Sequence, residues 1–239
     1  QVDTGWLAGL DAYWARIDSA YRDTLHSPLP KEDRGAFTVL PRFAPDPAFR
    51  VMARFEPQLG EVFGMKTTTE REPKYQRVGT LHFVVAGAEQ RLTVFRNIDL
   101  SRLEDYRNYL FVPFTDLTNG ETTYGGGRYL DLEGPLGETV ELDFNRAYNP
   151  YCAYGGHYSC PIPPAENHLE VAVKAGVLAT EAPNPKGLEI RGKVEGAMLK
   201  LGDKWRKHDF EALGEDKERL KKIMAETSRC IKCYSCISA

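Results

Sequence analysis

Long hydrophobic runs are missing from this 239-residue sequence. Its longest apolar stretches, such as residues 83–86 and 110–114, have the length of a β-strand, whereas a membrane-spanning helix needs about 18 or more consecutive apolar residues. Hydrophobic residues still make up 42% of the chain, which is enough material for a buried core. The composition therefore predicts a folded, soluble protein without a membrane span.

The motifs of several enzyme classes are also absent. The glycines at 125–127 allow positive φ angles and close backbone approach, but no lysine follows them at the spacing of a phosphate-binding loop. The sequence contains no Gly-x-Ser-x-Gly nucleophile motif and no His-Glu-x-x-His metal motif. Nucleotide binding, serine hydrolysis and zinc proteolysis thus lack support, and the sequence does not decide whether the protein is an enzyme.

An excess of basic residues is lacking as well. The net charge is −3, which argues against a nucleic-acid partner. Residues 186–239 carry 13 Lys/Arg and 9 Asp/Glu, a balance of +4 that leaves −7 on the remainder. This basic tail could attract its own domain or an acidic partner, although a solvated helix surface is the simpler interpretation.

The first residues lack the basic and apolar series of a signal peptide. The chain begins at Gln1 rather than at methionine, so a processed precursor is conceivable. We expect a cytoplasmic protein, with an exported form as the alternative.

Hydrophobic spacing predicts a mainly β, α+β fold. Apolar residues at helical spacing between Leu7 and Tyr21 indicate an amphipathic N-terminal helix that Asp3 or Thr4 caps. A two-residue period follows, on Phe49, Val51, Ala53, Phe55, Leu81, Phe83, Val85, Leu92, Val94, Val140, Leu142, Phe144, Leu169, Val171 and Val173. Short strands separated by Gly, Pro and Asn turns favour an antiparallel sandwich or a barrel-like sheet.

The chain is expected to consist of two unlike parts. The β-rich domain covers residues 1–180, and the proline-containing stretch 181–192 indicates a linker. Residues 193–239 are predicted to form a helical tail, in which Glu215 with Arg219 and Glu218 with Lys222 have i,i+4 spacing.

Two polar segments, residues 114–129 and 143–167, contain the candidate ligand-binding groups. Arginines can bind a carboxylate or phosphate through two parallel hydrogen bonds, but buried arginines also need acidic partners. The candidates are Asp116, Arg128, Asp143, Asn145, Arg146, Tyr148 and Glu166. They indicate either a pocket for an anionic small molecule or a network of internal ion pairs and hydrogen bonds.

These segments also carry a family resemblance. The run DLTNGETTYGGGRY at 116–129, DFNRAYNPYCAY at 143–154 and CPIPPAEN at 160–167 resemble the bacterial family of unknown function numbered 1684. The resemblance covers about residues 6–177. It implies a compact, mostly β domain, and the family has no settled biochemical activity.

Cys152 and Cys160 stand eight residues apart around the Gly155–Gly156 turn. This spacing suits a disulfide or a shared metal. A cysteine nucleophile with His157 as its base is a further alternative. We favour a structural pair, either bridged or reduced, that belongs to the domain rather than to the tail.

The tail ends in a Cys-x2-Cys-x2-Cys run formed by Cys230, Cys233 and Cys236. This spacing reproduces the first three ligands of a [4Fe–4S] cluster motif. Approximately residues 205–239 resemble the start of a ferredoxin-type domain. A fourth cysteine would stand where the sequence ends. The open alternatives are a longer parent sequence, a fourth ligand from Cys152, Cys160 or elsewhere, zinc in place of the cluster, or no cluster.

The leading hypothesis is a redox-linked protein with an iron–sulfur tail and a redox partner protein. The alternatives are a non-redox protein or hydrolase that acts on an anionic metabolite, and a structural or interaction module.

Overall fold

The computed structural model describes residues 3–23, 25–155 and 158–179. The chain divides into two units, residues 1–182 and 183–239. The predicted linker and helical tail, with Cys230, Cys233 and Cys236, lie outside the described residues. The following description concerns the first unit.

The predicted N-terminal helix is confirmed as α1 (Thr4–Arg22). Asp3 caps it, because its Oδ1 accepts a hydrogen bond from the backbone N–H of Trp6 at 3.0 Å. The buried face of the helix consists of Trp6, Leu10, Trp14, Asp18 and Tyr21. These positions recur every three to four residues, as expected for a helix that covers a core with one side.

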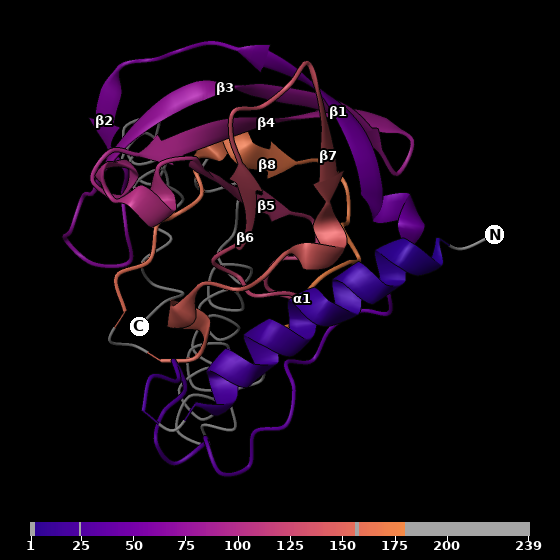
Figure 1. Ribbon diagram of the computed structural model, residues 1–239, viewed down its shortest axis with the longest axis vertical. Coiled ribbons are helices and arrows are strands. Elements are labelled where there is room, and N and C mark those ends of the chain that lie inside the picture. Colours follow the sequence, from indigo (N-terminus) through magenta and orange to yellow (C-terminus); the bar gives the residue numbers. More distant parts are fainter. Residues whose placement is uncertain (1–2, 24, 156–157, 180–239) are drawn as a thin grey trace, which may run out of the picture. The chain divides into compact units, whose positions relative to one another are not determined.

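The sheet is built from eight strands, and Figure 1 shows that it curls around the interior of the domain. The order along its main path is β6-β5-β4-β3-β1-β7, while β2 pairs with β3, and β8 pairs in parallel with β5. The strands are β1 (Arg50–Pro57), β2 (Val62–Gly64), β3 (Lys74–Val85), β4 (Ala88–Asn97), β5 (Tyr109–Asp116), β6 (Arg128–Glu133), β7 (Thr139–Asp143) and β8 (His168–Leu169). The short 3₁₀ helices are Pro47–Phe49, Leu100–Arg102, Glu104–Tyr106, Phe144–Arg146, Tyr151–Ala153 and Ala165–Asn167.

The longest ladder, between β3 and β4, closes through a two-residue turn. Ala86 and Gly87 have φ angles of 50° and 77°, and Val85 pairs with Ala88. Positive φ angles at both central residues match the twist of an antiparallel hairpin. This turn fixes the register that places Leu81, Phe83 and Val85 on the inner face.

All fifteen apolar residues of the predicted two-residue period pack in one core. That core also contains Leu110, Val112, Phe114 and Leu130 from β5 and β6. The curled single sheet confirms the barrel-like alternative rather than the sandwich. The secondary structure differs from the prediction in two respects. Phe49 and Phe144 lie in 3₁₀ helices rather than in strands. Of the residues 169–173, only Leu169 lies in a strand, and a bend follows it at 170–171.

Two further clusters flank this core. Under α1, the residues Trp6, Leu10, Trp14, Tyr21, Leu29, Leu40, Tyr154 and Val177 pack together. On the other face of β3 to β6, an aromatic cluster contains Met65, Tyr75, Phe95, Phe111 and Tyr129. Alternate residues of β5 thus face opposite sides: Leu110 and Val112 contribute to the main core, and Phe111 contributes to the aromatic cluster.

Candidate functional site

Arg128 and Asp116 form a fully enclosed ion pair. Their side chains have no exposed surface, and Nη2 of Arg128 lies 2.6 Å from Oδ2 of Asp116. The guanidinium also donates to the backbone carbonyls of Val173, at 2.9 Å, and Ala175. Burial lowers the pKa of Arg128, and the Asp116 carboxylate opposes that shift. Since this pair is closed to solvent, it joins β6 to residues 173–175 and has no access to a ligand.

The glycine run before Arg128 allows the backbone to pass close to β5. Among Gly125, Gly126 and Gly127, only Gly127 has a positive φ, +88°. A Cβ at Gly127 would lie 2.6 Å from the carbonyl oxygen of Phe114. The glycine therefore lets the chain enter β6 against β5, and the motif here serves a turn rather than a phosphate cradle.

The second polar segment, residues 143–167, contacts α1 through its first residues. Trp6 Nε1 donates to Oδ2 of Asp143 at 2.8 Å, and Trp14 Nε1 donates to the carbonyl of Asn145 at 3.1 Å. Tyr13 donates from its hydroxyl to the carbonyl of Arg146 at 2.9 Å. Each indole or phenol thus finds a partner while its ring is packed against the domain. Residues 143–146 are the docking point of the helix.

Polar contacts within this docking point fix its shape. Oδ1 of Asp143 accepts from the backbone N–H and from the side-chain amide of Asn145, at 3.0 and 2.8 Å. Asn145 also pairs with both backbone groups of Asp46. The Arg146 side chain is 43% exposed, and its Nε lies 3.6 Å from Asp143. The side chain of Arg146 thus carries a partly exposed charge beside the docking point.

A small cavity borders this docking point. It has a volume of about 120 Å³ and is lined by Leu10, Asp11, Trp14, Arg42, Phe43, Pro45 and Asn145. Ligand pockets for metabolite-sized molecules usually measure about 300–1,000 Å³. The cavity therefore has room for water or an ion, but not for a larger metabolite.

Glu166 lies apart from the other candidates. It forms a two-point pair with Arg77 of β3, with N–O distances of 2.8 and 2.7 Å, on the surface. The next residue, Asn167, is fully buried and bonds to Thr93 and Pro113. No contact of Glu166 with Asp116 or Asp143 occurs within the described residues.

Tyr148 belongs to a third group, centred on Asp131. Its hydroxyl donates to Oδ1 of Asp131 at 2.7 Å, and Tyr109 donates to the same oxygen at 2.8 Å. Asp131 is exposed, and desolvation by the surrounding protein raises its pKa. The structure therefore brings the sequence-predicted candidates together in separate sets rather than in one pocket.

Sequence reasoning missed Asp131 and Tyr109. Asp131 lies within β6, and Tyr109 is the first residue of β5. Their proximity to Tyr148 depends on the isolated bridge between Tyr129 and Tyr148. Such pairing between distant segments cannot be read from hydrophobic periodicity.

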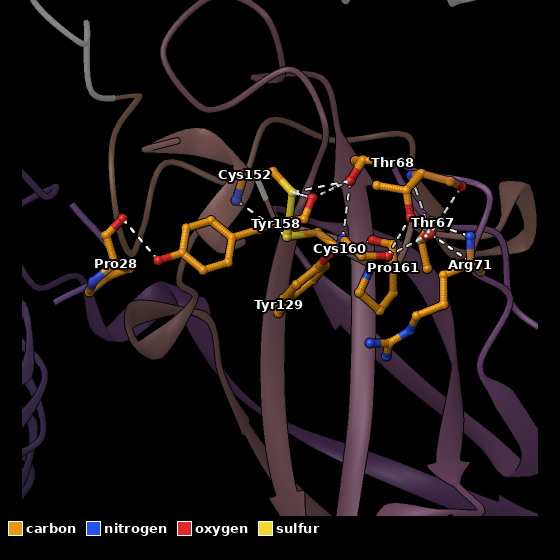
Figure 2. Close-up of a disulfide and its surroundings, with 11 residues drawn as sticks. Pro28, Thr67, Thr68, Arg71, Tyr129, Cys152, Tyr158, Cys160 and Pro161 are labelled. Carbon is orange, nitrogen blue, oxygen red and sulfur yellow. Dashed lines mark hydrogen bonds between the residues drawn. A yellow bond between two sulfur atoms is a disulfide. The ribbon is translucent and has the colours of Figure 1, made fainter. Parts of the chain in front are cut away.

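Cys152 and Cys160 form a disulfide, as Figure 2 shows. The hydroxyl of Thr68 lies 3.2 Å from Sγ of Cys152 and accepts from the backbone N–H of Cys160 at 3.1 Å. The bridge closes a loop with a sequence separation of 8. By the chain-entropy relation, such a loop stabilises the fold by about 2.5 kcal/mol.

The bridge has chemical consequences for the two sulfurs. A bridged sulfur is neither a thiolate nucleophile nor a metal ligand. The pair is thus present in its oxidised form. While the bridge is closed, neither Cys152 nor Cys160 can supply the fourth ligand to the tail cysteines. His157, the conceivable base, lies outside the described residues.

The described part of the chain contains no group of three or more His, Cys, Asp or Glu side chains that could hold a metal ion. Likewise, none of its helices is both long enough and apolar enough for a membrane span.

Two formate dehydrogenase subunits match part of the chain. Over 68 residues it is 44% identical to the F420-dependent formate dehydrogenase 1 subunit beta of Methanococcus maripaludis, and 37% identical to the corresponding subunit of Methanocaldococcus jannaschii. Each match covers 28% of this chain. The chain spans 17% of the length of these curated relatives.

The larger part of the chain resembles a protein of known structure and a known family. An uncharacterized protein from Haloarcula marismortui, solved by solution NMR, is 38% identical, with a TM-score of 0.58. The alignment covers 73% of this chain and 95% of that protein. Residues 35–178 match the family described as "Protein of unknown function (DUF1684)". The chain therefore belongs to the DUF1684 family.

Proposed function

We propose that the chain is an electron-transfer protein whose tail binds a [4Fe–4S] cluster through Cys230, Cys233 and Cys236. The observation that carries this proposal is the Cys-x2-Cys-x2-Cys spacing in a chain that is 44% identical, over 68 residues, to a formate dehydrogenase subunit. Thiolates at this spacing can reach successive irons of one cluster. When bound, such a cluster transfers single electrons.

The donor set fits a cluster only with one additional ligand. The sequence has five cysteines, and two of them are joined in the disulfide. The three tail cysteines therefore need a fourth ligand from another residue type, from a partner subunit or from a longer parent sequence. Arg229 and Lys232 lie beside these cysteines, and their positive charges would favour an acidic redox partner.

Anaerobic purification followed by iron, zinc and acid-labile sulfide analysis tests this proposal. We expect about four irons and four sulfides per chain, together with visible absorption from thiolate-ligated iron. Cys233→Ser should abolish both, because it removes one of the few available ligands, whereas Ser235→Ala should leave both unchanged. A colourless, metal-free protein would refute the proposal. Stoichiometric zinc without sulfide would indicate that the tail binds zinc instead of a cluster.

The second hypothesis, binding of an anionic metabolite, depends on Arg146. Arg128 is enclosed and cannot contact a ligand, whereas the side chain of Arg146 is 43% exposed. An exposed guanidinium is suited to a carboxylate or phosphate. Inorganic phosphate should then raise the melting temperature of the protein, and Arg146→Ala should remove this effect while Arg102→Ala retains it. An equal effect on both variants would count against the hypothesis.

A further inference from the structure

One carboxylate oxygen of Asp131 accepts hydrogen bonds from two tyrosines. The hydroxyls of Tyr148 and Tyr109 both donate to Oδ1, at 2.7 and 2.8 Å. Burial, together with the negative charge of Asp131, raises the pKa of each tyrosine. Both phenols are therefore protonated at neutral pH, and each uses its only proton on Asp131.

The groups that remain free are all acceptors. Oδ2 of Asp131 receives no hydrogen bond from any described residue, and each phenol oxygen keeps lone pairs. A ligand that binds to these three side chains must supply donors, because none of them has a donor left for an anion. The arrangement thus selects a cation or a neutral molecule rich in N–H or O–H groups.

The charge of Asp131 lacks a close counter-ion. Within the described residues, no Lys, Arg or His nitrogen lies within 4.0 Å of its carboxylate. Arg16 is the cation that acts on it, but the guanidinium of Arg16 lies over the ring of Tyr13, 5.6 Å from its centroid. Asp131 is exposed, so a cation from solution can reach it.

The flanking tyrosines are held in place by other rings. Tyr148 contacts Tyr129 edge to face with centroids 5.8 Å apart, and Tyr109 contacts Tyr106 in the same manner at 6.1 Å. The backbones of Tyr129 and Tyr148 also exchange hydrogen bonds of 2.9 and 3.1 Å. Little conformational freedom is therefore lost when a ligand binds, and aromatic faces beside a carboxylate favour organic cations.

We propose that Asp131, Tyr109 and Tyr148 form a binding site for the primary ammonium group of a small-molecule amine. A primary ammonium has three N–H donors, which match the carboxylate oxygen and the two phenol oxygens in number. Calcium takes six to eight oxygen ligands, and this group offers a single carboxylate. The site belongs to the DUF1684 domain and does not depend on a cluster in the tail.

Isothermal titration of the full chain with n-butylammonium chloride tests this site. We expect saturable binding of one equivalent. Asp131→Asn should weaken it about tenfold or more, because charge-assisted hydrogen bonds are lost. Tyr148→Phe removes one acceptor and should weaken it by a smaller factor. Glu89→Gln removes an exposed carboxylate at the start of β4 and should bind as the wild type does.

Folding and ligand controls keep the test decisive. Asp131→Asn retains an oxygen for both tyrosine hydroxyls, and its near-UV circular dichroism should match that of the wild type. Because the pKa of Asp131 is raised in the folded protein, removing its charge should leave the melting temperature unchanged or higher at neutral pH. The proposal is overturned if the wild type shows no saturable binding, if a folded Asp131→Asn binds equally well, or if tetramethylammonium or butyrate binds as tightly.

Discussion

Arg128→Ala is expected to lower the free energy of unfolding of the DUF1684 domain by about 3–5 kcal/mol. The substitution leaves the carboxylate of Asp116 buried without its counter-charge, which is one of the costliest changes in a protein interior. Whole domains are stable by about 5–15 kcal/mol. This one substitution would therefore remove a large fraction of the total.

The contacts of Arg128 explain why no neighbouring residue can compensate for the loss of its guanidinium. Its guanidinium bonds to Asp116 and to the carbonyls of Val173 and Ala175, so three acceptors lose a donor together. Asp116 keeps its bonds to Thr118, from the backbone N–H at 2.8 Å and the hydroxyl at 2.6 Å. These neutral donors orient the carboxylate but do not balance its charge.

Urea denaturation followed by near-UV circular dichroism measures the effect. Arg77→Ala is the control, because Arg77 is likewise paired with a carboxylate, that of Glu166, but on the surface. Exposed pairs contribute about 0–1 kcal/mol. The double variant with Asp116→Asn and Arg128→Met should lose less than Arg128→Ala, since no unpaired charge remains. If Arg128→Ala is as mild as Arg77→Ala, the enclosed pair has no special energetic role.

The main core could be predicted from the sequence because its signal is local. A strand places alternate side chains on one face, so period two identifies the inward residues wherever the strand lies in the sheet. Ala53 of β1 and Leu169 of β8 stand far apart in the sequence, and both belong to the one core. The capping of α1 by Asp3 or Thr4 was equally readable, because a capping residue and its donor, here Asp3 and the N–H of Trp6, are three residues apart.

The roles of the polar residues could not be read in this way. Asp143 bonds to Trp6, which is 137 residues away, and Trp14 bonds to Asn145, which is 131 residues away. The types and spacing of residues 143–146 suit a ligand site as well as a helix dock. Only the position of α1 distinguishes the two. The role of Asp131 in β6 could not be predicted for the same reason, because its partners are Tyr109 of β5 and Tyr148.

Asn167→Leu is expected to destabilise the domain by about 3 kcal/mol or more. The ladder between β4 and β5 has a single residue pair, Phe95 with Phe111, and Pro113 of β5 has no N–H to donate. The buried side chain of Asn167 fills this gap. It accepts from Thr93 N at 2.8 Å and donates to Thr93 O at 2.9 Å and Pro113 O at 2.7 Å. Leucine leaves these three buried groups without a partner, and each costs about 1–3 kcal/mol.

Asn167→Asp separates hydrogen bonding from packing, because the two side chains have nearly the same shape. An ionised aspartate can accept from Thr93 but cannot donate to either carbonyl, so its folded-state pKa should rise above the usual value of about 3.9. The unfolded chain then ionises at lower pH than the folded one. The loss of stability is complete above the folded-state pKa and diminishes as the pH falls through it towards the unfolded value. Urea denaturation across this pH range measures the effect. Asn167→Leu should show no such recovery, and Asn108→Asp, at an exposed position, should change stability by less than about 0.5 kcal/mol. A deficit for Asn167→Asp that does not depend on pH would mean that the two donated hydrogen bonds are not what joins β4 to β5.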